Sequence, residues 1–204
     1  MSNEKKIALI QGVIGGILAG IALSQYGFFL MPFAIALLWP ASKRPLAGGV
    51  WGGLAVLISH YWIIGLHPLT WIGISSSLSL LITFFIWFFC GALGFFLCSS
   101  WCFLGLSSYF VCSSSKSFRR RFLYAIFMSS IWGIAEVLLS HFPFFWIGIG
   151  TALLPNDIWL TGLARLTGAG GLVVIQFLIA WWIWQTVLAF QRRKSCLKIF
   201  FSGF

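Results

Sequence analysis

The chain has 204 residues, of which 60% are hydrophobic and only 8% are charged, and its mean hydropathy is +1.00. A water-soluble domain carries about 25% charged residues, so this composition excludes a soluble globule and predicts an all-α, polytopic membrane protein. The formal net charge of +10 does not indicate nucleic-acid binding, because the basic residues flank apolar segments and no nucleic-acid-binding motif accompanies them.

The positions of the basic residues predict the topology. Twelve of the thirteen fall in four clusters, and only Arg165 stands apart. The clusters are Lys5 and Lys6; Lys43 and Arg44; Lys116, Arg119, Arg120 and Arg121; and Arg192, Arg193, Lys194 and Lys198. The positive-inside rule places short loops rich in Lys and Arg on the cytoplasmic side, where they meet anionic headgroups. If all four clusters are cytoplasmic, an even number of crossings separates each cluster from the next.

The apolar segments between the clusters then supply about six transmembrane helices, with both termini in the cytoplasm. The predicted spans lie near residues 7–23, 28–39, 46–64, 78–97, 122–139 and 168–190. The first could be a cleaved signal peptide, but its long apolar run favours an uncleaved span. The second is short for the roughly 20 residues that a crossing needs, so a re-entrant hairpin is the alternative there. The predicted outer segments are 24–27, 65–73 and 140–167. Residues 1–204 are expected to form one transmembrane domain.

Two further features refine these spans. In the first span, Gly12, Gly16 and Gly20 are spaced four apart and share one helical face, which predicts that another helix approaches closely. The apolar tract 74–112 is long enough for one or two helices, and the parity of crossings allows only one. We therefore expect the part of this tract beyond residue 97 to continue as a helical extension along the membrane interface.

Glu136 is the acidic residue that needs an explanation, because it lies near the end of the predicted span 122–139. Ionisable groups at membrane depth are costly and usually face a protein interior or water. Glu136 is therefore either a structural carboxyl bonded to a neighbouring segment or a polar anchor for a lipid headgroup or substrate. Arg165, on the outer side, would meet a phosphate or pair with Asp157 or Glu136.

The remaining polar residues predict neither a metal site nor a catalytic centre. His60, His67 and His141 fall on the outer side, but their spacing offers no local pair of metal ligands, and we interpret them as interfacial residues beside the Trp and Tyr belt. The five cysteines show no metal-type spacing and are read as small apolar fillers. No nucleophile with a base and an orienting group is found, and no cofactor is predicted.

Several stretches, in order, resemble the N-terminal membrane region of bacterial apolipoprotein N-acyltransferases. They are QYGFFLMP at 25–32, GGL at 52–54 followed by HYWI at 60–63, WGIAE at 132–136, FPFFWIG at 142–148 and GLARLTG at 162–168. The resemblance covers nearly the whole chain. Two positions depart from the family pattern, since Leu139 stands where the family commonly has arginine and Arg165 where it has proline.

The resemblance implies an activity and also what this chain lacks. In the family, a periplasmic nitrilase-like domain with a Glu-Lys-Cys triad takes an acyl chain from phospholipid and passes it to the amino-terminal cysteine of a lipoprotein. No triad residue can be assigned in this chain, because Cys196 lies on the predicted cytoplasmic side. We therefore expect a truncated or split family member in the bacterial inner membrane, inactive as an acyltransferase alone.

The predicted role is a platform that docks phospholipid and a lipoprotein N-terminus, with a separate nitrilase-like subunit as a partner. The docking residues proposed for it are Glu136, Arg165, Trp146 and His141. Two alternatives are a small transporter or permease and a scaffold subunit of a membrane complex. A transporter of polar solutes normally has ionisable residues or broken helices near mid-membrane, and the predicted span interiors are nearly free of charge.

Overall fold

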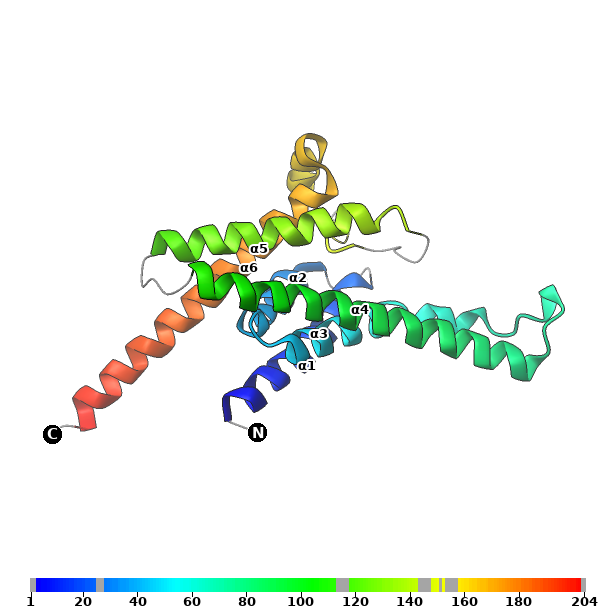
Figure 1. Cartoon of the computed structure of the whole chain (residues 1–204), viewed down its shortest axis with the longest axis horizontal. Helices are drawn as coiled ribbons and strands as arrows, with labels where there is room; N and C mark the ends of the chain where they lie inside the picture. Colours follow the sequence, from blue (N-terminus) through cyan, green and yellow to red (C-terminus); the bar gives the residue numbers. More distant parts are fainter. Residues whose placement is uncertain are drawn as a thin grey trace.

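The computed structural model describes residues 3–24, 28–112, 118–142, 148–150, 152 and 158–202, and every regular element in them is helical. The protein is an all-α membrane protein, as the composition predicts. Four helices are long and apolar enough to cross a bilayer: α1 (Asn3–Leu23), α4 (Ser76–Cys112), α5 (Phe118–Leu139) and α6 (Ile158–Ser202). Figure 1 shows α2 (Met31–Leu38) and α3 (Pro45–Ser59) near the middle of α4, whereas the segment between α3 and α4 lies toward the N-terminal end of α4.

The second and third predicted spans are helical but short. Helix α2 (Met31–Leu38) continues into the 3-10 turn η2 (Trp39–Ala41), and α3 (Pro45–Ser59) is followed by the 3-10 segment η3 (Tyr61–Leu66). Prolines explain these bounds, because Pro45 opens α3 with a backbone angle suited to a first turn, whereas Pro40 cannot donate the hydrogen bond that would continue α2. The count of six crossings therefore stays a prediction.

Helix α3 lies between α1 and α4 and touches both closely. A β-carbon added at Gly12 would lie 2.5 Å from the carbonyl oxygen of Ala47, and one added at Gly16 would lie 2.6 Å from that of Trp51. Side chains at these positions would collide with the α3 backbone, so the helices come together only because the side chains are absent. The predicted close approach along the glycine face of α1 is confirmed.

Helix α4 is a single helix of 37 residues, which at 1.5 Å per residue is about 55 Å long. It covers the predicted span 78–97 and continues to Cys112, so the tract is helical beyond residue 97; that this part lies along the membrane interface stays a prediction. The hydrocarbon core of a bilayer is only about 30 Å thick, and therefore α4 is longer than one perpendicular crossing requires. The chain passes from η3 through the turn η4 (Thr70–Ile72) into α4, and the first turns of α4 pack back on η3. Together they form an apolar hairpin that extends past the ends of α1 and α5 (Figure 1).

Helices α5 and α6 form an antiparallel pair. Gly133 of α5 faces Gly170 of α6, and Arg121 near the start of α5 contacts Gln185 in the second half of α6. Helix α6 begins at Ile158, inside the predicted outer segment 140–167, but it is interrupted at Gly168, whose φ of 64° is left-handed. Glycine adopts this conformation without steric cost, so the helix changes direction at the residue where the predicted span 168–190 begins.

An aromatic cluster joins the α5–α6 pair to the other helices. Trp39 of η2, Trp101 of α4, Trp132 of α5 and Phe177 of α6 meet with ring centroids 5.3–6.2 Å apart. The indole N–H groups of Trp39 and Trp101 donate to the carbonyl oxygens of Phe177 and Met128, at 3.0 and 2.9 Å. We call these four residues the aromatic junction. It fixes four elements against one another with their buried N–H groups satisfied.

The contact between α3 and α4 can be tested with two neighbouring glycines. An added β-carbon at Gly52 would fall within 3.0 Å of the carbonyl oxygen of Gly94 and of the side chain of Cys98. One added at Gly53 would have its nearest neighbour 3.4 Å away. We expect Gly52→Ala to lower the free energy of unfolding by about 1–3 kcal/mol through overpacking. Thermal unfolding of the detergent-solubilised chain measures this.

Gly53→Ala is the matched control, since it adds the same methyl group one residue away in ordinary van der Waals space. Replacing glycine by alanine inside a helix favours the helix by about 1 kcal/mol, so this variant should be as stable as the unmodified chain or slightly more stable. Equal unfolding midpoints for the two variants would contradict the close approach of α3 and α4.

Candidate functional site

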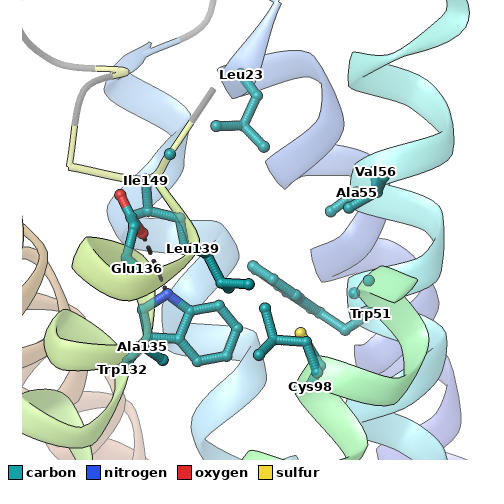
Figure 2. A pocket seen from close by; sticks show the side chains of 14 residues that line it. Leu23, Trp51, Ala55, Val56, Cys98, Trp132, Ala135, Glu136, Leu139 and Ile149 are labelled. Carbon is teal, nitrogen blue, oxygen red and sulfur yellow. Dashed lines mark hydrogen bonds between the residues drawn. The ribbon is translucent and has the colours of Figure 1, made fainter. Parts of the chain in front are cut away.

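A cavity lies among α1, α3, α4, α5 and the segment 148–149. Most of its lining side chains are apolar, and they come from segments far apart in the sequence (Figure 2). The lining residues are Leu23, Trp51, Gly52, Ala55, Val56, Gly94, Leu97, Cys98, Trp132, Ala135, Glu136, Leu139, Gly148 and Ile149. Ligand cavities in proteins share this largely apolar character, with few polar groups.

Glu136 is the one carboxylate in that lining, and its side chain is already bonded within the protein. One oxygen, Oε1, accepts a hydrogen bond from the backbone amide of Gly150 at 2.7 Å, and Oε2 accepts one from Trp132 Nε1 at 3.3 Å. Trp132 and Glu136 are four residues apart and so share a face of α5. Glu136 is only 5% exposed. These contacts favour the structural interpretation of Glu136 over a carboxylate that is free to meet a ligand.

The segment 148–150 is held from two sides. Glu136 binds the amide of Gly150 from α5, and Gln176 of α6 donates from Nε2 to the carbonyl oxygen of Ile149 at 2.9 Å. The Glu136 carboxylate lies so close to Gly148 that a β-carbon there would collide with it. Because backbone polar groups in an apolar surrounding need internal partners, Glu136 and Gln176 together allow a non-helical segment to close one side of the cavity.

The opposite side of the cavity is formed by helix faces. Trp51 of α3 donates from its indole N–H to the carbonyl oxygen of Ala34 at 3.0 Å, which fixes the plane of its ring. Figure 2 shows Trp51 and Leu139 pointing toward each other across the space, with Cys98 beside Trp51 and Glu136 on the side of Ile149. The walls of the cavity are therefore largely apolar, and Glu136 is its one carboxylate.

The arrangement offers no catalytic chemistry in the described residues. No three His, Cys, Asp or Glu side chains gather there as metal ligands would. Cys90, Cys98 and Cys102 are buried free cysteines of α4, and the cavity lining brings no histidine or lysine to Cys98.

Of the three sequence-predicted site residues that the structure describes, only Glu136 lines the cavity. His141 is exposed in the turn after α5, where its Nδ1 lies 3.0 Å from the carbonyl oxygen of Val137. Arg165 is exposed on α6, three residues before the break at Gly168, and Trp146 lies outside the described residues. The structure therefore does not bring His141 or Arg165 together with Glu136.

Sequence reasoning missed the residues that give the cavity its shape, above all Trp51, Leu139 and Ile149. They belong to three different segments and carry no motif of their own. Two signals were present in the sequence: Gly52, in the glycine-rich third span, and Gly148, at the end of the FPFFWIG stretch, both line the cavity. The glycines indicate close packing, but the sequence does not show which elements meet there.

Sequence comparison identifies curated relatives that match this chain over nearly its full length. The protein of Prochlorococcus marinus strain MIT 9313 is 48% identical over 203 residues, which is 100% of this chain and 41% of the relative. That of a second strain of the same species is 42% identical over 203 residues, again 100% of this chain and 41% of the relative. In Parasynechococcus marenigrum strain WH8102 the identity is 40% over 196 residues, covering 96% and 41%. Each is named apolipoprotein N-acyltransferase.

The chain belongs to the apolipoprotein N-acyltransferase family. It spans about two fifths of the length of these relatives and corresponds to their N-terminal part. The family resemblance that the ordered motifs indicate is thereby confirmed. No family model matches the sequence, and no solved structure matches it.

The role of Glu136 in closing the cavity gives a second test. In Glu136→Ala, the amide of Gly150 and the indole N–H of Trp132 lose their acceptor, and an unsatisfied buried donor costs about 1–3 kcal/mol. We expect hydrogen exchange of the Gly150 amide to accelerate strongly, measured by mass spectrometry on the chain in detergent. Glu4→Ala, at an exposed carboxylate of α1, is the control, and unchanged protection in Glu136→Ala would refute the role.

Proposed function

We propose that this chain acts as the membrane-embedded part of an apolipoprotein N-acyltransferase and binds an acyl chain of phospholipid in the cavity beside Glu136. The cavity is the observation that carries this proposal, because its largely apolar lining suits hydrocarbon. The names of the relatives indicate a reaction that transfers an acyl group to a lipoprotein. Such a protein needs a place where an acyl chain is held apart from the bulk bilayer.

The packing of α4 and α5 supports lateral access to this cavity. Toward the end of α4 and the start of α5 the two helices are joined, since Tyr124 donates to the carbonyl oxygen of Gly105 at 3.0 Å and Trp101 donates to that of Met128. The cavity lies beyond these contacts, where α4 contributes Gly94, Leu97 and Cys98. An acyl chain from the surrounding lipid would therefore enter between the separated halves of α4 and α5.

We further propose six crossings in the bacterial inner membrane, with both termini cytoplasmic. The four long apolar helices and the two shorter ones are compatible with this topology. The lipid headgroup would lie near the outer end of the α5–α6 pair. His141 and Arg165 are exposed there, and Trp146 is the third contact that we propose from the sequence.

In this proposal Glu136 is a positioning residue. It holds the segment 148–150 over the cavity and does not contact the reacting atoms. The lipoprotein N-terminus and a nitrilase-like polypeptide are the proposed partners that would complete the reaction. The direct test is transfer of a radiolabelled acyl group from phospholipid to a lipoprotein N-terminal cysteine. The assay uses the purified chain alone and the chain mixed with a nitrilase-like polypeptide from the same genome.

Transfer that requires both polypeptides would support the proposal. Absence of transfer by the mixture, with a full-length relative active in the same assay, would contradict it. Flux of a polar solute into liposomes that contain the chain alone would instead identify a transporter.

Filling the cavity tests the lipid-binding step by itself. Ala135 lines the cavity, whereas its neighbour Ile134 is 62% exposed and faces away from it. We expect Ala135→Phe to reduce photo-crosslinking of a phospholipid with a diazirine on its acyl chain by about tenfold, because the added ring occupies the cavity. A loss of about 1.4 kcal/mol of binding free energy corresponds to that factor. Equal crosslinking in Ala135→Phe and the control Ile134→Phe would rule out this cavity.

A further inference from the structure

A cluster of arginines lies at the opposite end of the α5–α6 pair from the cavity. The first turn of α5 carries Arg119, Arg120 and Arg121 in succession and contains no acidic residue. The positive end of the helix dipole lies here, so cations are unfavourable and an anion is stabilised. Three arginines at this position therefore create a local excess of positive charge that the helix itself does not offset.

The chain has almost no carboxylates with which to neutralise that charge. It contains three acidic residues in total. Glu4 binds Arg44 at 3.0 Å, Glu136 binds the segment at the cavity, and Asp157 lies outside the described residues. Among the described residues, the Arg44–Glu4 pair is the one salt bridge. The described part of the chain therefore pairs no carboxylate with the arginines of α5, which leaves them available to an anion from outside the chain.

Arg121 has an unused donor at this site. Its Nη1 donates to Oε1 of Gln185 on α6 at 3.3 Å, while its Nε is buried and has no hydrogen-bond partner among the described residues. A buried donor without an acceptor costs free energy. A small rotation of the guanidinium toward an anionic oxygen would satisfy it, and the fork of an arginine suits a phosphate. Arg119 and Arg120 are exposed on the adjoining face of α5.

Aromatic side chains adjoin these arginines on the membrane side. Phe118 stacks on Phe122 and contacts Trp181 and Trp182 of α6, with ring centroids 5.8–6.2 Å apart. Phe118 and Trp182 remain 49% and 51% exposed. Tryptophan and phenylalanine at headgroup depth favour contact with the glycerol region and the first methylenes of a lipid. Cations and exposed aromatic rings side by side match an amphiphile better than a free anion.

We propose that Arg119, Arg120 and Arg121, together with Gln185, Phe118 and Trp182, form a binding site for the headgroup of an anionic phospholipid. The phosphate lies against the arginines, and the glycerol lies against the aromatic rings. This site is distinct from the cavity beside Glu136, because it lies at the other end of α5. Its ligand binds α5 to α6 at the membrane surface and leaves the acyl-chain cavity free.

The test is a titration of phosphatidylglycerol into the detergent-solubilised chain, with bound lipid counted by native mass spectrometry. Each arginine near a membrane surface contributes about 1 kcal/mol to binding of anionic lipid. We therefore expect Arg121→Gln and Arg120→Gln each to weaken binding by about fivefold. Arg120 is exposed, so its replacement tests the site without disturbing the α5–α6 contact. Binding should also weaken as salt is added.

Lys6→Gln is the matched control, because Lys6 is exposed on α1 and its replacement removes the same charge elsewhere. Wild-type affinity in Arg120→Gln and Arg121→Gln, or equal losses in Lys6→Gln, would overturn the proposal. Phosphatidylcholine should bind weakly. Displacement of phosphatidylglycerol by inorganic phosphate at equal concentration would also overturn it, since that result identifies a free-anion site.

Discussion

The aromatic junction of Trp39, Trp101, Trp132 and Phe177 is the contact on which the arrangement of the helices depends. It joins η2, α4, α5 and α6 through edge-to-face and tilted ring contacts, and its indole N–H groups are satisfied by carbonyl oxygens and by Glu136. Within a bilayer, helices gain little from hydrophobic burial, because lipid is as apolar as their side chains. Complementary packing, ring contacts and hydrogen bonds must therefore hold the α5–α6 pair against the other helices, and the aromatic junction supplies all three.

The cavity follows from that junction. Trp132 belongs to the junction and also lines the cavity, so α4 and α5 are joined at this level and the open space lies beyond it. Glu136, one turn further along α5, receives the Trp132 N–H and the amide of Gly150, and these bonds place a non-helical segment over the space. The tight glycine contacts of α3 with α1 and α4 keep the opposite wall close. These bonds and contacts thus define the walls of the cavity in which we propose that an acyl chain binds.

The two sites on α5 use charge in opposite ways. At one end, Glu136 is buried, bonded internally and engaged in holding backbone. At the other, three arginines lie in the first turn of the helix with little internal compensation. The acidic residue therefore contributes to the fold, whereas we propose that the basic residues contact lipid. In a chain with so few charges, this proposal assigns to one helix both an internal cavity and a contact with the membrane surface.

The sequence by itself determined the helical membrane class, the glycine face of α1, the start of a new helical segment at Gly168 and the family. These features are local or compositional: apolar length, four-residue spacing and ordered motifs are all legible along the chain. Only the tertiary structure decided that Glu136 bonds to Gly150, that Trp51 and Leu139 face one cavity, and that Arg165 and His141 do not line it. Such contacts join segments that are far apart in the sequence. They depend on the directions of neighbouring helices, and no short motif encodes those directions. The predicted spans 28–39 and 46–64 show the same limit, because apolar length indicates helix but not whether a short helix crosses a bilayer.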